Sequence, residues 1–192
     1  MSQGLTGSTV YGLLSDADRK QVRATLGTEH AHFYHATVKR HLDSIRQHGL
    51  DPRFEGEDSS YGHRQHEPYK ALHYATKPFL ELAFSAASTR ARVWNEALGI
   101  DVSNDGEVVI VRMPADSILT RSFGLDHSFG NMRLAAEVML ASKEQLSAEE
   151  FVSLVRQFGA ISCYDPIPPE ELEICTDSVC SFDGSFAPLL VA

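Results

Sequence analysis

The sequence of 192 residues is poor in cysteine and has no long apolar run. Its three cysteines, Cys163, Cys175 and Cys180, do not suit a disulfide framework or a zinc module, which favours a reducing compartment. No stretch reaches the roughly 18 uninterrupted apolar residues of a membrane helix. Residues 1–10 lack the basic and apolar regions of a secretory signal. We therefore expect neither a membrane anchor nor a signal peptide.

Common catalytic motifs are also missing from the sequence. It contains no Walker A sequence, no G-x-G-x-x-G after a strand, no G-x-S-x-G elbow and no H-E-x-x-H. His63, His66 and His73 could share a metal, but their spacing fits no standard site. We interpret them as solvated histidines and expect no metal. Cys163 is interpreted as a buried apolar residue of a strand rather than a nucleophile.

Acidic side chains outnumber basic ones, 26 against 17, which argues against broad affinity for nucleic acid. The imbalance is uneven: residues 32–92 hold 9 basic and 7 acidic side chains, and the rest of the chain holds 8 and 19. Seven of the nine histidines lie in the same segment. This segment could hold a phosphate-bearing small molecule; the alternative is chance clustering on a solvated surface.

The length and a hydrophobic content of 43% predict one globular domain over residues 1–192, with a loose leader at 1–14 and a tail at 176–192. Local patterns predict helices over 16–26, between Thr37 and Gly49, over 78–98 and over 148–158. They predict strands over 32–36, 71–75, 107–113, 134–140, 160–164 and 172–175. This mixture predicts an α+β fold with a split, largely antiparallel sheet and flanking helices.

Three segments in order carry the most specific signal. They are Tyr34-His35-Ala36-Thr37 with Gly49-Leu50 after it, Tyr74-Ala75-Thr76 followed by Phe84, and Glu137 in an apolar run. At these residues the chain resembles the ADP-ribosyltransferase superfamily, most closely its diphtheria-toxin and poly-ADP-ribose-polymerase branch. That family writes the first strand as Tyr-His-Gly-Thr. Ala36 replaces its glycine, and Phe84 replaces its usual second tyrosine.

The resemblance implies an NAD-dependent mono-ADP-ribosyltransferase of the toxin or effector kind, which releases nicotinamide. Breaking the bond between nicotinamide and ribose puts positive charge on the sugar, and a carboxylate beside it stabilises that charge. The resemblance gives this catalytic role to Glu137. His35, the second catalytic position, would hydrogen-bond a ribose hydroxyl of NAD.

The other implied cofactor contacts surround the nicotinamide ring. The backbone of Ala36 would pair with the carboxamide, and the Thr37 hydroxyl would support the strand. Tyr74 and Phe84 would hold the cationic ring by stacking. Arg53 is a candidate phosphate contact by charge and position, and residues 51–70 are a candidate cover or target-recognition loop.

Several alternatives remain at this level. The sequence Tyr164-Asp165 before a proline-rich turn also fits the family's closing strand, and on that alignment the glutamate position falls near Ala160. The same fold is shared by RNA 2′-phosphotransferases and by non-catalytic proteins that bind NAD, ADP-ribose or a protein. We expect an acceptor that is a protein rather than nucleic acid, with an antitoxin or immunity protein as a candidate partner. The expected location is cytoplasmic, or a target cell reached without a signal peptide.

Overall fold

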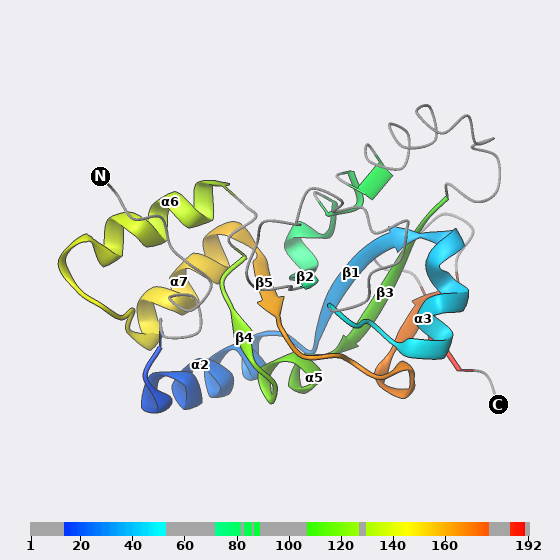
Figure 1. The fold of residues 1–192 in the computed structure, drawn as a ribbon, viewed down its shortest axis with the longest axis horizontal. Helices are drawn as coiled ribbons and strands as arrows, with labels where there is room; N and C mark the ends of the chain where they lie inside the picture. The colour runs from blue at the N-terminus through cyan, green and yellow to red at the C-terminus, as the bar shows by residue number, and fades with distance from the viewer. Residues whose placement is uncertain are drawn as a thin grey trace.

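The structure is a computed structural model that describes residues 14–52, 72–81, 83–85, 87–88, 107–126, 130–176 and 185–190. Within these residues seven strands form one antiparallel sheet in the order β4-β5-β2-β1-β3-β6-β7 (Figure 1). The strands are β1 (His32–Val38), β2 (Leu72–Ala75), β3 (Val108–Pro114), β4 (Phe123–Gly124), β5 (Ala160–Cys163), β6 (Glu173–Cys175) and β7 (Phe186–Pro188). The chain therefore has the expected α+β fold.

Helices flank this sheet. The α-helices are α2 (Asp16–Glu29), α3 (Leu42–His48), α5 (Ala115–Leu119), α6 (Gly130–Met139) and α7 (Ala148–Phe158). Short 3-10 turns are η1 (Lys39–His41), η3 (Lys77–Phe79), η4 (Leu140–Ser142) and η5 (Pro169–Glu171). Residues 80–81, 83–85 and 87–88 are helical after η3. Among the described residues no helix has the length and apolar character needed to cross a membrane.

The sheet is split between β1 and β2. On one side β1 pairs with β3 along its whole length, from His32 opposite Pro114 to Val38 opposite Val108. On the other side β1 meets β2 in a single pair, Tyr34 opposite Ala75. Two half-sheets, β4-β5-β2 and β1-β3-β6-β7, therefore join at one point and separate beyond it, as the sequence predicted.

One face of the sheet, which we call the core face, is apolar and covered by α2, α5 and α7. Because side chains alternate across a strand, paired residues share a face. The main core includes these strand residues: Phe33, Tyr74, Val111, Ile161 and Cys163. It also includes helix residues from α2, α5 and α7: Val22, Leu26, Ile118, Leu119, Phe151 and Leu154. We call the opposite side the second face; its apolar cluster is Tyr34, Leu80, Ile110 and Cys175.

Helix ends follow the sequence signals at three places. Ser15 caps α2 by accepting a hydrogen bond from the Asp18 N–H at 3.1 Å, and Ser147 and Glu150 form the expected capping box of α7. Gly49 ends α3 with φ of 73°, and a Cβ there would lie 2.1 Å from the Ile167 carbonyl oxygen. Only glycine suits this close approach.

Two expected helix boundaries are wrong. α2 does not stop at Gly27 but continues to Glu29, since an unconstrained glycine inside a helix weakens it without ending it. Thr37 does not cap the next helix, because it lies inside β1, opposite Val109 of β3. Seven successive pairs with β3 extend β1 to Val38, so pairing across the sheet overrides the local cap signal.

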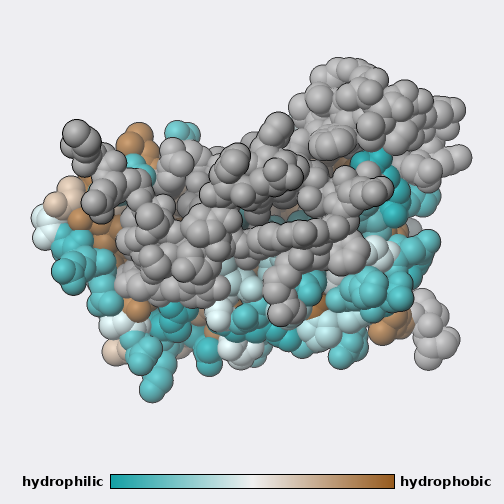
Figure 2. All heavy atoms as spheres, in the orientation of Figure 1, coloured by the Kyte–Doolittle hydropathy of each residue, from teal (hydrophilic) through white to brown (hydrophobic). Residues whose placement is uncertain are grey.

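The expected strand over 134–140 is also wrong, because this segment forms the end of α6 and the start of η4. Its apolar residues have helical spacing: Met132 and Ala136 are buried, four residues apart, whereas Leu134 and Val138 are 60% and 68% exposed. Figure 2 shows hydrophobic side chains on the surface at this end of the molecule. The apolar residues of 134–140 therefore have the period of a helix and not that of a strand.

The remaining differences concern short elements, and several expectations fall on residues outside the described ranges. α5, β4 and β7 were not expected, because elements of two to five residues carry little periodic signal. The candidate loop 51–70 beyond residue 52, the helix beyond residue 88, Arg53, His63, His66 and Cys180 lie outside the described residues. The described cysteines, Cys163 and Cys175, are buried and unbridged.

Candidate functional site

His35 is anchored where β1 leaves β2. Its Nδ1 lies 3.0 Å from the backbone oxygen of His73, and since a carbonyl only accepts, Nδ1 carries the proton and donates. Burial lowers the pKa of His35 to about 4, against the opposing effect of this hydrogen bond. The imidazole is therefore neutral near pH 7, with Nε2 as its lone-pair acceptor.

The Tyr74 ring lies beside the His35 ring on the core face. The two rings have centroids 5.7 Å apart and are tilted by 53°. Tyr74 is 1% exposed, its hydroxyl has no hydrogen-bond partner within the described residues, and burial raises its pKa well above 10. The structure thus brings the predicted histidine and tyrosine together, with the tyrosine ring packed inside rather than open to a ligand.

Phe84 lies elsewhere. It packs against the apolar cluster of the second face, which contains Tyr34 and Ile110, whereas Tyr74 belongs to the main core. Ala36 and Thr37 lie in β1, opposite Ile110 and Val109 of β3. The two aromatic rings expected to enclose nicotinamide are therefore in separate clusters.

Glu137 does not stand on a strand beside His35. It lies on α6, which packs against η4 and α7. Figure 1 shows α6 at the left end of the molecule, beside α7, and β1 in the other half. The strand next to β2 is instead β5, with Ala160 opposite Ala75. The second alignment puts the family's glutamate near this position.

A buried polar cluster of three side chains was missed by the sequence analysis. Asp126 Oδ1 lies 2.7 Å from His73 Nδ1, and the two side chains are 8% and 10% exposed. Ser162 Oγ lies 2.9 Å from the same nitrogen, and Ser162 is fully buried. A serine nucleophile and its acid would need opposite ring nitrogens, so this polar cluster is not a hydrolase triad.

No local motif could have revealed the polar cluster, because its members come from three separate segments. His73 pairs with Ser162 across β2 and β5, and Gly124 pairs with Ser162 across β4 and β5. A lone carboxylate at Asp126, shortly after Phe123-Gly124, has no recognisable spacing to either residue. Only the strand register brings the three together.

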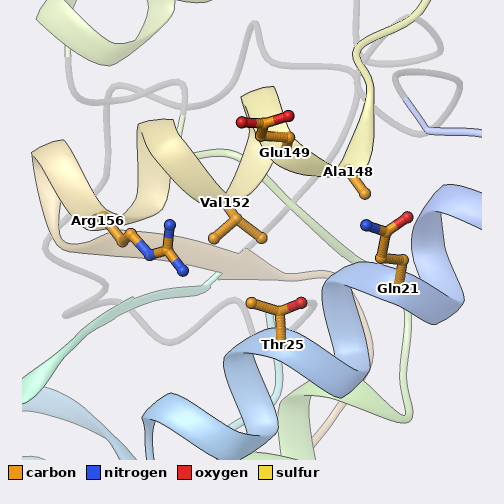
Figure 3. Close-up of a pocket in the computed structure, with 6 residues that line it drawn as sticks. All are labelled: Gln21, Thr25, Ala148, Glu149, Val152 and Arg156. Atoms are coloured by element: carbon orange, nitrogen blue, oxygen red, sulfur yellow. The ribbon is translucent and has the colours of Figure 1, made fainter.

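A pocket between α2 and α7 lies apart from these residues (Figure 3). Its volume is about 200 Å³, and it is lined by Gln21, Thr25, Ala148, Glu149, Val152 and Arg156. This volume is below the roughly 300–1,000 Å³ of small-molecule sites. Arg156 in its wall already pairs with Glu29. None of the residues expected to bind NAD lines this pocket.

In the described part of the chain, no three histidine, cysteine, aspartate or glutamate side chains are grouped so that they could hold a metal ion. No protein-family model and no curated protein matches the sequence. A solved structure named EcPltA is similar, with 14% identity, 83% of each chain covered and a TM-score of 0.35. A similarity at this level assigns no family.

Proposed function

We propose that the chain binds NAD at the split between β1 and β2 and transfers ADP-ribose to a macromolecular acceptor, releasing nicotinamide. The observation that carries this proposal is the His35 ring, fixed at the split by its bond to His73 and kept neutral by burial. A neutral ring with its proton on Nδ1 offers Nε2 to a ribose hydroxyl. The resemblance at Tyr34-His35-Ala36-Thr37 gives that hydroxyl its identity as part of NAD.

The reaction would break the bond between the ribose C1′ and the nicotinamide nitrogen. The bonding electrons leave with nicotinamide, which becomes neutral, and C1′ acquires oxocarbenium-like charge. A nucleophile of the acceptor then bonds to C1′. His35 would hold the ribose in place, which contributes to rate by fixing orientation. An acceptor that is a protein suits the formal charge of −9 better than nucleic acid does.

A second function, binding NAD or ADP-ribose without cleaving it, is favoured by one observation. β5 lies beside β2, yet its residue at the candidate glutamate position is Ala160, which has no charge. A chain that keeps His35 but has no carboxylate at the split would bind the dinucleotide and leave the glycosidic bond intact.

Both functions are tested by titrating the whole protein with NAD and with ADP-ribose in a calorimeter and measuring nicotinamide release by chromatography. We expect His35→Ala to weaken NAD binding about tenfold, since a hydrogen bond of about 1–1.5 kcal/mol is lost. His48→Ala, an exposed histidine on α3, is the matched control and should bind as the wild type does.

The pH dependence sharpens this test. Because the pKa of His35 is about 4, Nε2 stays an acceptor down to about pH 5, so affinity should be constant from pH 8 to pH 5.5 and fall as the pH approaches 4. Equal NAD affinity in wild type and His35→Ala, or no binding of either nucleotide by the wild type, would contradict the proposal.

A further inference from the structure

The single pair between β1 and β2 sets the position of His35 relative to Tyr74. Tyr34 lies opposite Ala75, so the next residue of β1 comes beside the preceding residue of the antiparallel β2. The ring centroids of His35 and Tyr74 are accordingly only 5.7 Å apart. His35 also lies opposite Val111 of β3, which belongs to the main core. Both rings therefore lie on the core face, beside the split.

Two successive residues of β2 hold the His35 ring. The backbone oxygen of His73 accepts a hydrogen bond from its Nδ1 at 3.0 Å, which fixes the direction of the ring. Tyr74 packs against the imidazole with the two rings tilted by 53°. Because protein interiors are close-packed, a buried ring at this distance occupies space that water would otherwise take. β2 thus both orients the imidazole and dries one side of it.

Tyr74 has no exposed surface with which to bind a ligand itself. It is 1% exposed and lies in the main core, opposite Ile161 of β5. Its hydroxyl is buried and has no hydrogen-bond partner within the described residues. A ring that stacks on nicotinamide must present a face to it. In this arrangement Tyr74 can therefore affect NAD only through a residue that it contacts.

Burial is the main reason why His35 is neutral. It lowers the pKa of His35 from 6.5 to about 4, although the hydrogen bond to the His73 carbonyl opposes this effect. The charges of His73 on β2 and of His41 on η1 lower the same pKa further. A substitution at Tyr74 leaves both of these histidines in place, so it isolates the effect of burial.

We propose that Tyr74 is a positioning residue of this site, whose ring holds the His35 imidazole at the split, keeps water from it and does not itself contact nicotinamide. The inference rests on the proposed binding of NAD at the split. With Tyr74 in place, Nε2 of His35 stays a hydrogen-bond acceptor for a ribose hydroxyl over the whole range in which the ring is neutral. This role replaces the stacking on nicotinamide that the resemblance gives to Tyr74.

The test measures the pKa of His35 by NMR titration of its ring protons in the protein without NAD, with His35→Ala used to assign the signal. Tyr74→Leu removes the ring and keeps the position apolar, so that water can reach the imidazole. Tyr74→Phe keeps the ring and removes only the hydroxyl. We expect the pKa of His35 to rise from about 4 towards 6.5 in Tyr74→Leu and to stay unchanged in Tyr74→Phe.

The pH profile of NAD affinity gives a second readout. It should be flat from pH 8 to pH 5.5 in the wild type and in Tyr74→Phe. An imidazole with the ordinary pKa of 6.5 is only about one-tenth neutral at pH 5.5, so Tyr74→Leu should lose about three- to tenfold in affinity over the same range.

Phe151→Leu is the matched control, because it also truncates a fully buried aromatic side chain of the main core. It should lower stability and leave the pH profile flat. A merely structural role of Tyr74 would make Tyr74→Leu behave in the same way as Phe151→Leu.

A measurement on the wild type covers the case in which Tyr74→Leu does not fold, which circular dichroism would show. In wild type saturated with NAD, nuclear Overhauser effects should connect the ring protons of Tyr74 with those of His35. None should connect the Tyr74 ring with the nicotinamide protons.

The outcomes distinguish this inference from the function beneath it. The role of Tyr74 is overturned by an unchanged pKa of His35 in folded Tyr74→Leu, by a Tyr74→Phe profile that follows that of Tyr74→Leu, or by an Overhauser effect between Tyr74 and nicotinamide. Each of these results leaves the binding of NAD intact. A wild type that does not bind NAD contradicts the proposed function and with it this role, even where the pKa of His35 rises in Tyr74→Leu.

Discussion

The two faces of the sheet use the same strands for different purposes. On the core face, Tyr74 of β2 and Ile161 of β5 are buried in one apolar cluster beneath α2, α5 and α7. On the second face, the next residues of the same strands, His73 and Ser162, join Asp126 in the polar cluster. A change of one position along a strand thus separates an apolar core residue from a buried polar one.

The faces also differ in what burial costs. Apolar side chains on the core face gain about 25 cal/mol for each Å² removed from water. Buried polar side chains must instead be paired, and each member of the polar cluster has a partner within hydrogen-bond distance. Truncating an apolar side chain on the core face should therefore lower stability by lost burial, and a substitution in the polar cluster should lower it by leaving a buried polar group without its partner.

The largest expected effect is from Phe151→Ala on the core face. Phe151 is fully buried, and its ring meets that of Phe123 edge to face at 5.9 Å. Truncation should lower the free energy of unfolding by about 3–5 kcal/mol, because it removes burial and leaves a cavity. Urea denaturation measures this. An unchanged free energy of unfolding would contradict the place of Phe151 in the apolar core.

An intermediate effect is expected at Gly159, where α7 ends and β5 begins. Its φ of 65° is left-handed, which costs an alanine about 1–2 kcal/mol, and a Cβ would overlap the Phe79 ring at 1.9 Å. Gly159→Ala should therefore lower the thermal midpoint. Gly27→Ala is the matched control: its Cβ would have ordinary contacts of 3.7 Å or more inside α2, so it should raise stability by about 0.5–1 kcal/mol. Equal changes in the thermal midpoint for Gly159→Ala and Gly27→Ala would contradict the left-handed conformation of Gly159.

The smallest effect is expected at Glu150, on the surface and outside both faces. Hydrogen bonds from Lys143 and from the Ser147 backbone lower its pKa from 4.5 to about 2. An acid whose pKa is lower in the folded than in the unfolded chain stabilises the fold at a pH above its unfolded pKa. The contribution of Glu150 to the free energy of unfolding is therefore complete above about pH 4.5 and is lost as the pH falls towards 2. At pH 7 the free energy of unfolding of the wild type, measured by urea denaturation, should exceed that of Glu150→Gln by at most about 1 kcal/mol. A difference in stability between the two proteins that grows as the pH is lowered would contradict this prediction.

Local chemistry predicted much of the fold. The capping box at Ser147, the β-branched run in β3 and the glycine after α3 each specify their element within a few residues, and the structure confirms them. The strand expected around Glu137 is wrong because apolar content alone does not separate a strand from a helix, and Leu134 and Val138 are exposed on α6. For the site, the resemblance placed His35 and Tyr74 around one dinucleotide, and the structure brings their ring centroids to 5.7 Å.

The sequence by itself determined the α+β class, most helix and strand positions, and the aromatic and histidine residues beside the split, because these depend on spacing within about ten residues. Tertiary structure alone decided which polar side chains are buried together. Asp126, His73 and Ser162 meet only through the pairing of β4, β5 and β2. Register between distant strands is fixed by the whole packed core, so no local pattern records it.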